Sequence, residues 1–342
     1  MAELVWKGKN TVIDSNQSIE FMQKKHENPA LITYQYCPLE NGSEIPSDTW
    51  YNRLIKGDKV FILPALQQEF TNAIDLIYID PPFMTGRTFS NGNRIAYRDI
   101  WNNDLDTYLQ WLYETLQALY TLLASDGSLY LHLDWRTIHY AKIILDEIFS
   151  SGKSPHGSGF KNEIIWHYQS GGYPQRYYAR KHDTLLLYTK SGEYCFHSER
   201  VGQRRGTTKR NHMRKEIGPD GRIAWTIRTA GRVYTYDEDK LMSLADVWSD
   251  ISHLHQKDPE RTGYATQKPE ALLERIILAS SEDNDLVLDC FCGSGVTPAV
   301  AEQLGRRWIA CDKSEMSITM SCERLLLGER RRPFVLQQAT ET

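Results

Sequence analysis

Long apolar segments are missing from this sequence of 342 residues. No stretch approaches the roughly 18 consecutive apolar residues that a membrane-spanning helix needs, so we expect no membrane association. The first seven residues, Met-Ala-Glu-Leu-Val-Trp-Lys, show neither a basic segment before an apolar one nor a cleavage site of small residues. Secretion is therefore not indicated, and we expect a cytoplasmic location.

Closely spaced cysteines are also scarce, which bears on metal binding. Of the six cysteines, only Cys290 and Cys292 lie near each other, and a single residue separates them. Structural zinc sites usually place roughly two to four residues between paired ligands, and one pair supplies only half of a four-ligand site. The histidines, His132 among them, show no ligand-like pairing. We therefore expect reduced thiols and no metal.

An overall excess of basic residues is lacking, but the charge is unevenly distributed. The chain has 40 basic and 44 acidic residues, a net charge of -4. The segment Arg200–Arg232 holds ten basic residues against two acidic ones, so its balance is +8 and that of the remaining chain is -12. Taken alone, such a cluster is typical of a solvated surface, and it indicates a function only through its position in the chain, which is considered below.

Apolar strands alternate with amphipathic helices, the pattern of a mostly parallel sheet covered on both faces. The first clear strand is Ile74–Ile79, and two prolines end it because they lack backbone donors. The other predicted strands are 128–133, 162–168, 184–188, 286–290 and 307–311, and the predicted helices are 109–123, 137–149, 269–281, 296–304 and 314–327. Between about residues 190 and 250 the alternation fails, which predicts an inserted second domain.

A glycine turn joins one of these strands to the next helix. It reads Asp289-Cys290-Phe291-Cys292-Gly293-Ser294-Gly295, and glycines at the carboxyl end of a strand let a ligand approach the backbone closely. A nicotinamide dinucleotide site is the alternative, but its fingerprint needs a third small residue where Pro298 stands. Asp312 follows the next strand, where a carboxylate can accept hydrogen bonds from both ribose hydroxyls of an adenosyl group.

A second turn, Asp80-Pro81-Pro82-Phe83, lies at the same kind of strand end. By itself it is a rigid strand exit with a capping Asp, but its groups can also activate an exocyclic amine. The Asp80 carboxylate and the Pro81 carbonyl can each accept one amine hydrogen, while Phe83 can stack on a base rotated out of a duplex. A related reaction, methylation of cytosine at carbon 5, needs a thiol nucleophile, typically in a Pro-Cys dipeptide. The chain has no Pro-Cys dipeptide, so this reaction is not indicated.

These residues resemble the amino-group DNA methyltransferases. Asp80-Pro81-Pro82-Phe83 matches the catalytic motif of that family, and Asp289-x-Phe291-x-Gly293-x-Gly295 matches its cofactor motif. The catalytic motif precedes the basic segment, which precedes the cofactor loop, and this order resembles the circularly permuted beta class. The matches extend from about Arg53 to about Leu327. One departure is Phe83, where tyrosine is more frequent, and it should preserve stacking.

The resemblance implies S-adenosylmethionine as cofactor. Gly57-Asp58 resembles the family position whose carboxylate contacts the cofactor adenine, and Thr266-Gln267-Lys268-Pro269 resembles the segment that closes over the methionine end. The full set of expected cofactor contacts is Asp58, Thr266, Gln267, Lys268, Asp289, Phe291, Gly293, Ser294, Gly295 and Asp312.

The implied fold is α/β: a Rossmann-like methyltransferase fold with a mostly parallel seven-stranded sheet, helices on both faces and an inserted small target-recognition domain. The expected divisions are an N-terminal extension of unknown role (1–52), the catalytic half of the methyltransferase domain (53–189), the target-recognition domain (190–250), the cofactor-binding half (251–330) and a tail (331–342).

The basic segment falls in the expected target-recognition domain, where Lys and Arg would contact phosphates and a few side chains would read base edges. A second stretch joins Tyr173, Tyr177 and Tyr178 to basic residues and suits the border of a flipped base or the DNA backbone. The expected DNA contacts are Arg176, Arg180, Arg204, Arg205, Lys209, Arg210, Arg214 and Lys215.

The implied activity is methylation of adenine N6 at a specific site in double-stranded DNA. In this family an initial Asp before Pro-Pro usually accompanies adenine N6, and an initial Ser usually accompanies cytosine N4. Three alternatives stay open: cytosine-N4 methylation, methylation of an RNA or protein amide, and a DNA-binding module without turnover. A homodimer and a separate restriction enzyme are compatible with the resemblance.

Overall fold

The computed structural model describes residues 3–9, 30–37, 50–91, 94–102, 104–149, 157–169, 171–206, 212–328 and 332–340. The chain divides into two compact units: Met1–Cys195 with Asp246–Thr342 form the larger one, and Phe196–Ala245 form the smaller one. The expected insertion, residues 190–250, contains the smaller unit. Within the described ranges, no helix is both long enough and apolar enough to cross a membrane.

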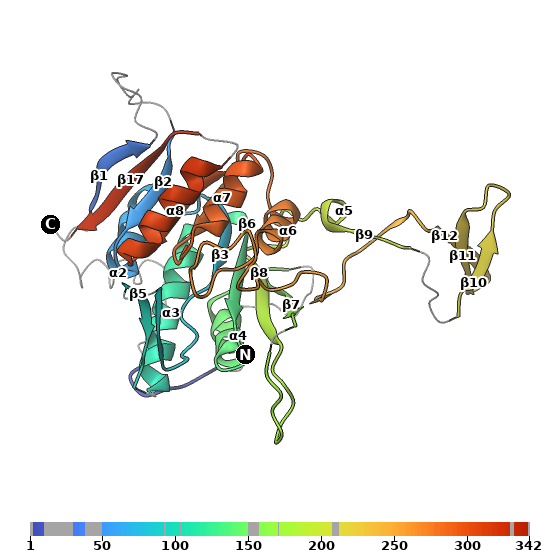
Figure 1. Ribbon diagram of the computed structural model, residues 1–342, viewed down its shortest axis with the longest axis horizontal. Coiled ribbons are helices and arrows are strands. Elements are labelled where there is room, and N and C mark those ends of the chain that lie inside the picture. Colours follow the sequence, from blue (N-terminus) through green and yellow to red (C-terminus); the bar gives the residue numbers. More distant parts are fainter. Residues whose placement is uncertain are drawn as a thin grey trace. The chain divides into compact units, whose positions relative to one another are not determined.

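The larger unit is built on a mixed, mostly parallel sheet of ten described strands (Figure 1). Seven strands form its centre in the order β2-β16-β15-β3-β6-β8-β7, and β8 is antiparallel to both of its neighbours. This centre confirms the expected α/β fold. Its strands are β2 (Asn52–Lys56), β3 (Ile74–Ile79), β6 (Leu123–Leu133), β7 (Gly159–His167), β8 (His182–Thr189), β15 (Leu286–Asp289) and β16 (Arg307–Asp312).

Three further strands widen the sheet beyond the seven that we expected. β1 (Ala30–Cys37) and β17 (Phe334–Thr340) extend one edge, and β14 (Val247–Trp248) extends the other. The prediction of a loose C-terminal tail was therefore wrong for β17, which runs parallel to β2 and antiparallel to β1. Its short apolar run is followed by two glutamines, a weak strand pattern that becomes a strand because neighbouring strands pair with it.

Helices cover both faces of the sheet. α2 (Lys59–Phe70), α3 (Leu105–Leu122) and α4 (Ile138–Ile148) pack on one another in succession, as do α6 (Glu270–Ser280), α7 (Val296–Gln303) and α8 (Glu315–Leu327). Figure 1 shows the two groups on opposite sides of the strands. β3 lies between them and is almost wholly buried, which explains its continuous apolar sequence.

The remaining elements are small. In the larger unit, β4 (Arg87–Asn91) and β5 (Arg94–Asp99) form an antiparallel hairpin directly after the Asp-Pro-Pro-Phe turn. The smaller unit holds α5 (Ser198–Val201), the pair β9 (Gln203–Arg204) and β13 (Leu241–Met242), and an antiparallel sheet of β10 (Arg214–Ile217), β11 (Ile223–Thr229) and β12 (Arg232–Asp237). Its Trp225 is buried, with the Arg205 guanidinium 5.2 Å from the ring centre.

Candidate active site

The strands β2, β16, β15 and β3 run parallel, so their carboxyl ends meet at one edge of the sheet. The segments after these strands line a pocket of about 520 Å³, within the range of small-molecule sites. Of the residues expected to act in catalysis or cofactor binding, every one lines this pocket except Gly295. The sequence did not single out several aromatic residues that also line it: Tyr78, Phe89, Tyr97, Trp101, Trp111 and Tyr264.

Asp80 follows β3 directly and forms an ion pair that the sequence did not reveal. Its Oδ2 lies 2.5 Å from Nζ of Lys268, and the two side chains are only 17% and 12% exposed. The same Nζ lies 5.1 Å from the ring centre of Phe83. The Pro82 carbonyl accepts a hydrogen bond of 2.9 Å from the Tyr108 hydroxyl, which ties the turn to α3. The pocket therefore brings a carboxylate, an ammonium group and an aromatic ring together.

The two glycines of the turn after β15 have different structural roles. Gly293 has a φ of 52° and donates its backbone N–H to Asp312 Oδ2 at 2.9 Å, so the loop backbone faces the pocket. Gly295 has a φ of 74° at the start of α7, and a Cβ there would lie 2.7 Å from the Cα of Ser321. Gly295 is thus required for the close packing of α7 against α8 rather than for ligand approach.

Asp289 is hydrogen-bonded to this turn through both of its carboxylate oxygens. Its Oδ1 accepts the backbone N–H of Phe291 at 2.9 Å, and its Oδ2 accepts the Thr297 hydroxyl at 2.5 Å. Burial raises the pKa of the Asp289 carboxyl to about 7. Because both oxygens already hold the turn and the first residues of α7, Asp289 fixes the shape of the loop.

Asp312 and Asp58 present carboxylates to the same pocket. Asp312 accepts backbone N–H groups from Gly293 and Ser314, and burial raises the pKa of its carboxyl to about 6. Asp58 caps α2 by accepting the Val60 N–H, and it pairs with Lys313 at 2.7 Å. Burial raises the pKa of Asp58, but the hydrogen bonds from Lys313 and Val60 outweigh burial and leave that pKa below its usual value.

The profile of a DNA methylase family that comprises N6 and N4 enzymes matches residues 74–323. The chain belongs to this DNA methylase family.

Individual relatives agree with this assignment. The methylase chain is similar to the type II methyltransferase M.HpaI of Haemophilus parainfluenzae, with 30% identity over 275 residues that cover 80% of this chain and 74% of the relative. It is also similar to the DNA adenine methyltransferase YhdJ of Escherichia coli (strain K12), with 28% identity over 274 residues that cover 80% and 82%.

Solved structures share the fold of the methylase. The PvuII DNA methyltransferase (cytosine-N4-specific) superposes with a TM-score of 0.54 at 18% identity, covering 81% of this chain and 88% of that one. The complex of M1.HpyAVI with SAM gives a TM-score of 0.51 at 19% identity, covering 80% and 99%.

The residues expected to contact DNA occupy different environments in the methylase. Arg176 and Arg180 are exposed in the larger unit, and Arg214 and Lys215 are exposed on β10 of the smaller unit. Arg204 is also exposed and pairs with Asp239. Arg205 is only 4% exposed and packs against Trp225, so we do not include it in a proposed DNA interface. Lys209 and Arg210 lie outside the described residues.

A buried polar network lies behind the Phe83 ring of the methylase. His132 is fully buried, its Nδ1 lies 2.9 Å from the Tyr78 hydroxyl, and its Nε2 lies 3.3 Å from Asp183 Oδ2. The imidazole centre is 5.9 Å from that of Phe83. The sequence showed no ligand-like pairing for His132, because its partners Tyr78 and Asp183 lie on two other strands, β3 and β8.

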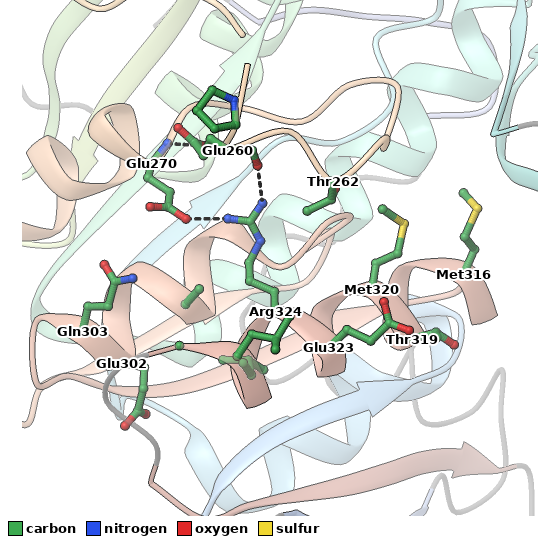
Figure 2. A pocket seen from close by; sticks show the side chains of 15 residues that line it. Glu260, Thr262, Glu270, Glu302, Gln303, Met316, Thr319, Met320, Glu323 and Arg324 are labelled. Atoms are coloured by element: carbon green, nitrogen blue, oxygen red, sulfur yellow. Dashed lines mark hydrogen bonds and ion pairs between the residues drawn. The ribbon is translucent and has the colours of Figure 1, made fainter. Parts of the chain in front are cut away.

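The methylase has a second cavity of about 790 Å³, lined largely by α7, α8 and the segment before α6 (Figure 2). Figure 2 shows Arg324 joined to Glu270, with an Oε1 distance of 2.6 Å, and to the backbone of Glu260. Other carboxylates of the lining are those of Glu302 and Glu323. None of the residues expected to act in catalysis or cofactor binding lines this cavity, so we assign it no part in the reaction.

Proposed function

We propose that this methylase transfers a methyl group from S-adenosylmethionine to N6 of an adenine in duplex DNA. One observation carries the proposal: Asp80 of the Asp-Pro-Pro-Phe turn and the glycine turn with Asp312 line the same pocket. An amine bound at Asp80 would therefore lie beside a cofactor held by the turn.

The residues of the pocket fit an adenosyl cofactor. Asp312 and Asp58 offer carboxylate oxygens for hydroxyl or amino donors of the cofactor. The Gly293 backbone packs closely on Tyr264, since a Cβ added at Gly293 would lie 3.1 Å from the Tyr264 ring. Phe291 and Trp111 add flat apolar surface, with ring centres 5.6 Å apart. Among the related structures, M1.HpyAVI was solved in complex with SAM.

S-adenosylmethionine supplies an electrophilic methyl group on a sulfonium. The exocyclic amine of adenine is a weak nucleophile because its lone pair is delocalised into the ring. The Asp80 carboxylate and the Pro81 carbonyl accept the two amine hydrogens and draw the nitrogen toward tetrahedral geometry. Phe83 stacks on the extruded base, and the two prolines hold both acceptors rigidly.

The choice of adenine rests on the first residue of the turn and on a relative. The turn begins with Asp80 rather than Ser, and the E. coli relative is named a DNA adenine methyltransferase. The PvuII neighbour, in contrast, is specific for cytosine N4. Adenine and cytosine present the same kind of amine to the same acceptors, so the base must be identified from the product.

The test is to incubate purified protein and labelled S-adenosylmethionine with duplex DNA, and in separate reactions with RNA and with protein, then digest the DNA to nucleosides and separate them. We expect N6-methyladenine. If N4-methylcytosine were the only product, the target base would be cytosine rather than adenine. If RNA or protein were labelled but duplex DNA never was, the proposal would be refuted. Asp80→Ala should lower kcat by on the order of 100-fold or more, because it removes a preorganised acceptor. Glu69→Ala is the control, because the exposed Glu69 carboxylate pairs with Arg53 and neither residue lines the pocket.

A further inference from the structure

The connection between β7 and β8 is rich in tyrosine and basic residues, and most of its tyrosine side chains are exposed. We call residues 168–181 the aromatic arm, and the structure describes all of them except Ser170. They contain four tyrosines and the basic residues Arg176, Arg180 and Lys181, but no aspartate or glutamate. Tyr173, Tyr177 and Tyr178 are 92%, 61% and 98% exposed. Large exposed rings among cations without carboxylates are typical of surfaces that contact nucleic acid.

The aromatic arm leaves the sheet at the same edge as Asp80. β3 is parallel to β6, with Ile79 opposite Leu131, and β8 is antiparallel to β6, with Thr184 opposite Leu133. The start of β8 therefore lies at the edge where β3 ends. Figure 1 shows the arm as a narrow loop that continues beyond the ends of β7 and β8.

The root of the arm is bonded to the network behind Phe83. The backbone N–H of Tyr168 donates to the Lys181 carbonyl at 3.0 Å, which closes the neck of the arm. The Tyr168 hydroxyl donates to Asp183 at 3.0 Å, and Asp183 in turn holds His132, which contacts Phe83. The root of the arm is thus fixed with respect to the ring that is proposed to stack on the extruded base.

Arg180 of the arm packs against the rest of the larger unit, whereas Tyr178 is almost fully exposed. The Arg180 guanidinium stacks on Trp135, in the turn after β6, at 3.8 Å from the ring centre, and it lies 5.1 Å from the Tyr177 ring. Tyr178 lies between Arg176 and Arg180 in the sequence and is almost fully exposed. A tyrosine in that setting has a free aromatic face, and adjacent cations can hold phosphates on both sides of it.

We propose that the aromatic arm enters the duplex beside the target base, and that Tyr178 stacks in the space the base leaves. This inference rests on the proposed function, since it presumes that a paired base is extruded into the pocket at Asp80. Extrusion breaks stacking and pairing in the duplex, and stacking of a base on an aromatic side chain compensates for part of that loss. The arm therefore matters most for methylation of paired bases and less for bases that are already unpaired, because extrusion of an unpaired base costs less.

The experiment compares kcat/KM for two duplexes, after sequencing of DNA from expressing cells has located the target. In one duplex the target base is paired; in the other it faces an abasic site. We expect Tyr178→Ala to lose roughly 10- to 100-fold on the paired duplex and less than about 3-fold on the abasic one. Tyr178→Phe keeps the ring and should retain activity on both. Tyr140→Ala, which removes a partly exposed tyrosine of α4, is the matched control.

The outcomes separate this inference from the proposed function. Equal losses of Tyr178→Ala on both duplexes, or no loss on either, with an active wild-type protein, would overturn the role of the arm and leave the proposed function standing. A wild-type protein that is inactive on both duplexes would overturn the proposed function, and the role of the arm would fall with it.

Discussion

Replacement of Lys268 by methionine tests the ion pair at the centre of the pocket. Lys268 resembles a cofactor contact in sequence, but its Nζ lies 2.5 Å from Asp80 Oδ2 and over the Phe83 ring. If it orients Asp80, its loss should slow the transfer step. If instead it holds the cofactor, its loss should weaken cofactor binding.

The size of the effect follows from distance and burial. At an effective dielectric constant of about 20, unit charges about 3 Å apart attract by roughly 5 kcal/mol before desolvation is subtracted. Exposed pairs retain about 1 kcal/mol or less, whereas breaking a buried pair costs about 3–5 kcal/mol. With side chains 12% and 17% exposed, this pair is closer to the buried case. We expect a loss of about 1.4–2.8 kcal/mol in transition-state stabilisation, or about 10- to 100-fold in kcat.

The assay measures kcat at saturating DNA and cofactor, and the dissociation constant of S-adenosylmethionine by calorimetry. Lys268→Met should lower kcat as stated and change the dissociation constant by less than about 3-fold, and Lys268→Arg should recover part of kcat because it keeps the charge. Lys142→Met is the control, since Lys142 forms a more exposed pair with Asp146 on α4, outside the pocket. A weakened dissociation constant with normal kcat would refute the role of Lys268 in orienting Asp80.

Three further predictions concern the cofactor, the fold and DNA. Because burial raises the pKa of Asp312 to about 6, affinity for S-adenosylmethionine should fall as the pH drops through about 6, and Asp312→Asn should abolish this dependence in calorimetric titrations. Glu302→Leu should lower the free energy of unfolding in urea by on the order of 3–5 kcal/mol, because the buried Glu302 carboxylate pairs with the Arg332 guanidinium. Arg214→Ala combined with Lys215→Ala should reduce the slope of log affinity against log salt by about 2, if each side chain contacts one phosphate.

The fold was predictable where periodicity was strong. The strand Ile74–Ile79 has the predicted bounds, and the predicted helix 314–327 begins one residue later, at Glu315. β17 was missed because its sequence has little strand pattern of its own. Its burial depends on pairing with β2 and β1, which are remote in sequence, and on the Arg332–Glu302 pair that holds its entry.

The candidate site was predictable as a set of residues but not as a set of contacts. Strand ends and glycines identified Asp80, Asp289 and Asp312, because parallel strands bring their carboxyl ends to one edge. The sequence could not distinguish what each carboxylate does. Asp289 bonds to its own loop, Asp312 bonds to the Gly293 backbone while lining the pocket, and Asp80 bonds to a lysine 188 residues away.

The Asp80–Lys268 pair joins two segments that are far apart in the chain. Lys268 precedes α6, on the side of the chain that carries the cofactor loop, whereas Asp80 precedes the hairpin β4–β5 and α3. An amine that enters between Asp80 and Phe83 must share the carboxylate with Lys268, because one oxygen already accepts the ammonium group at 2.5 Å. A carboxylate has two oxygens and about four lone-pair sites, so it can accept an amine hydrogen while Lys268 holds its orientation. Lys268 then restricts the rotation of the Asp80 side chain but leaves the carboxylate able to accept the amine hydrogen. Loss of Lys268 should therefore reduce kcat rather than abolish activity.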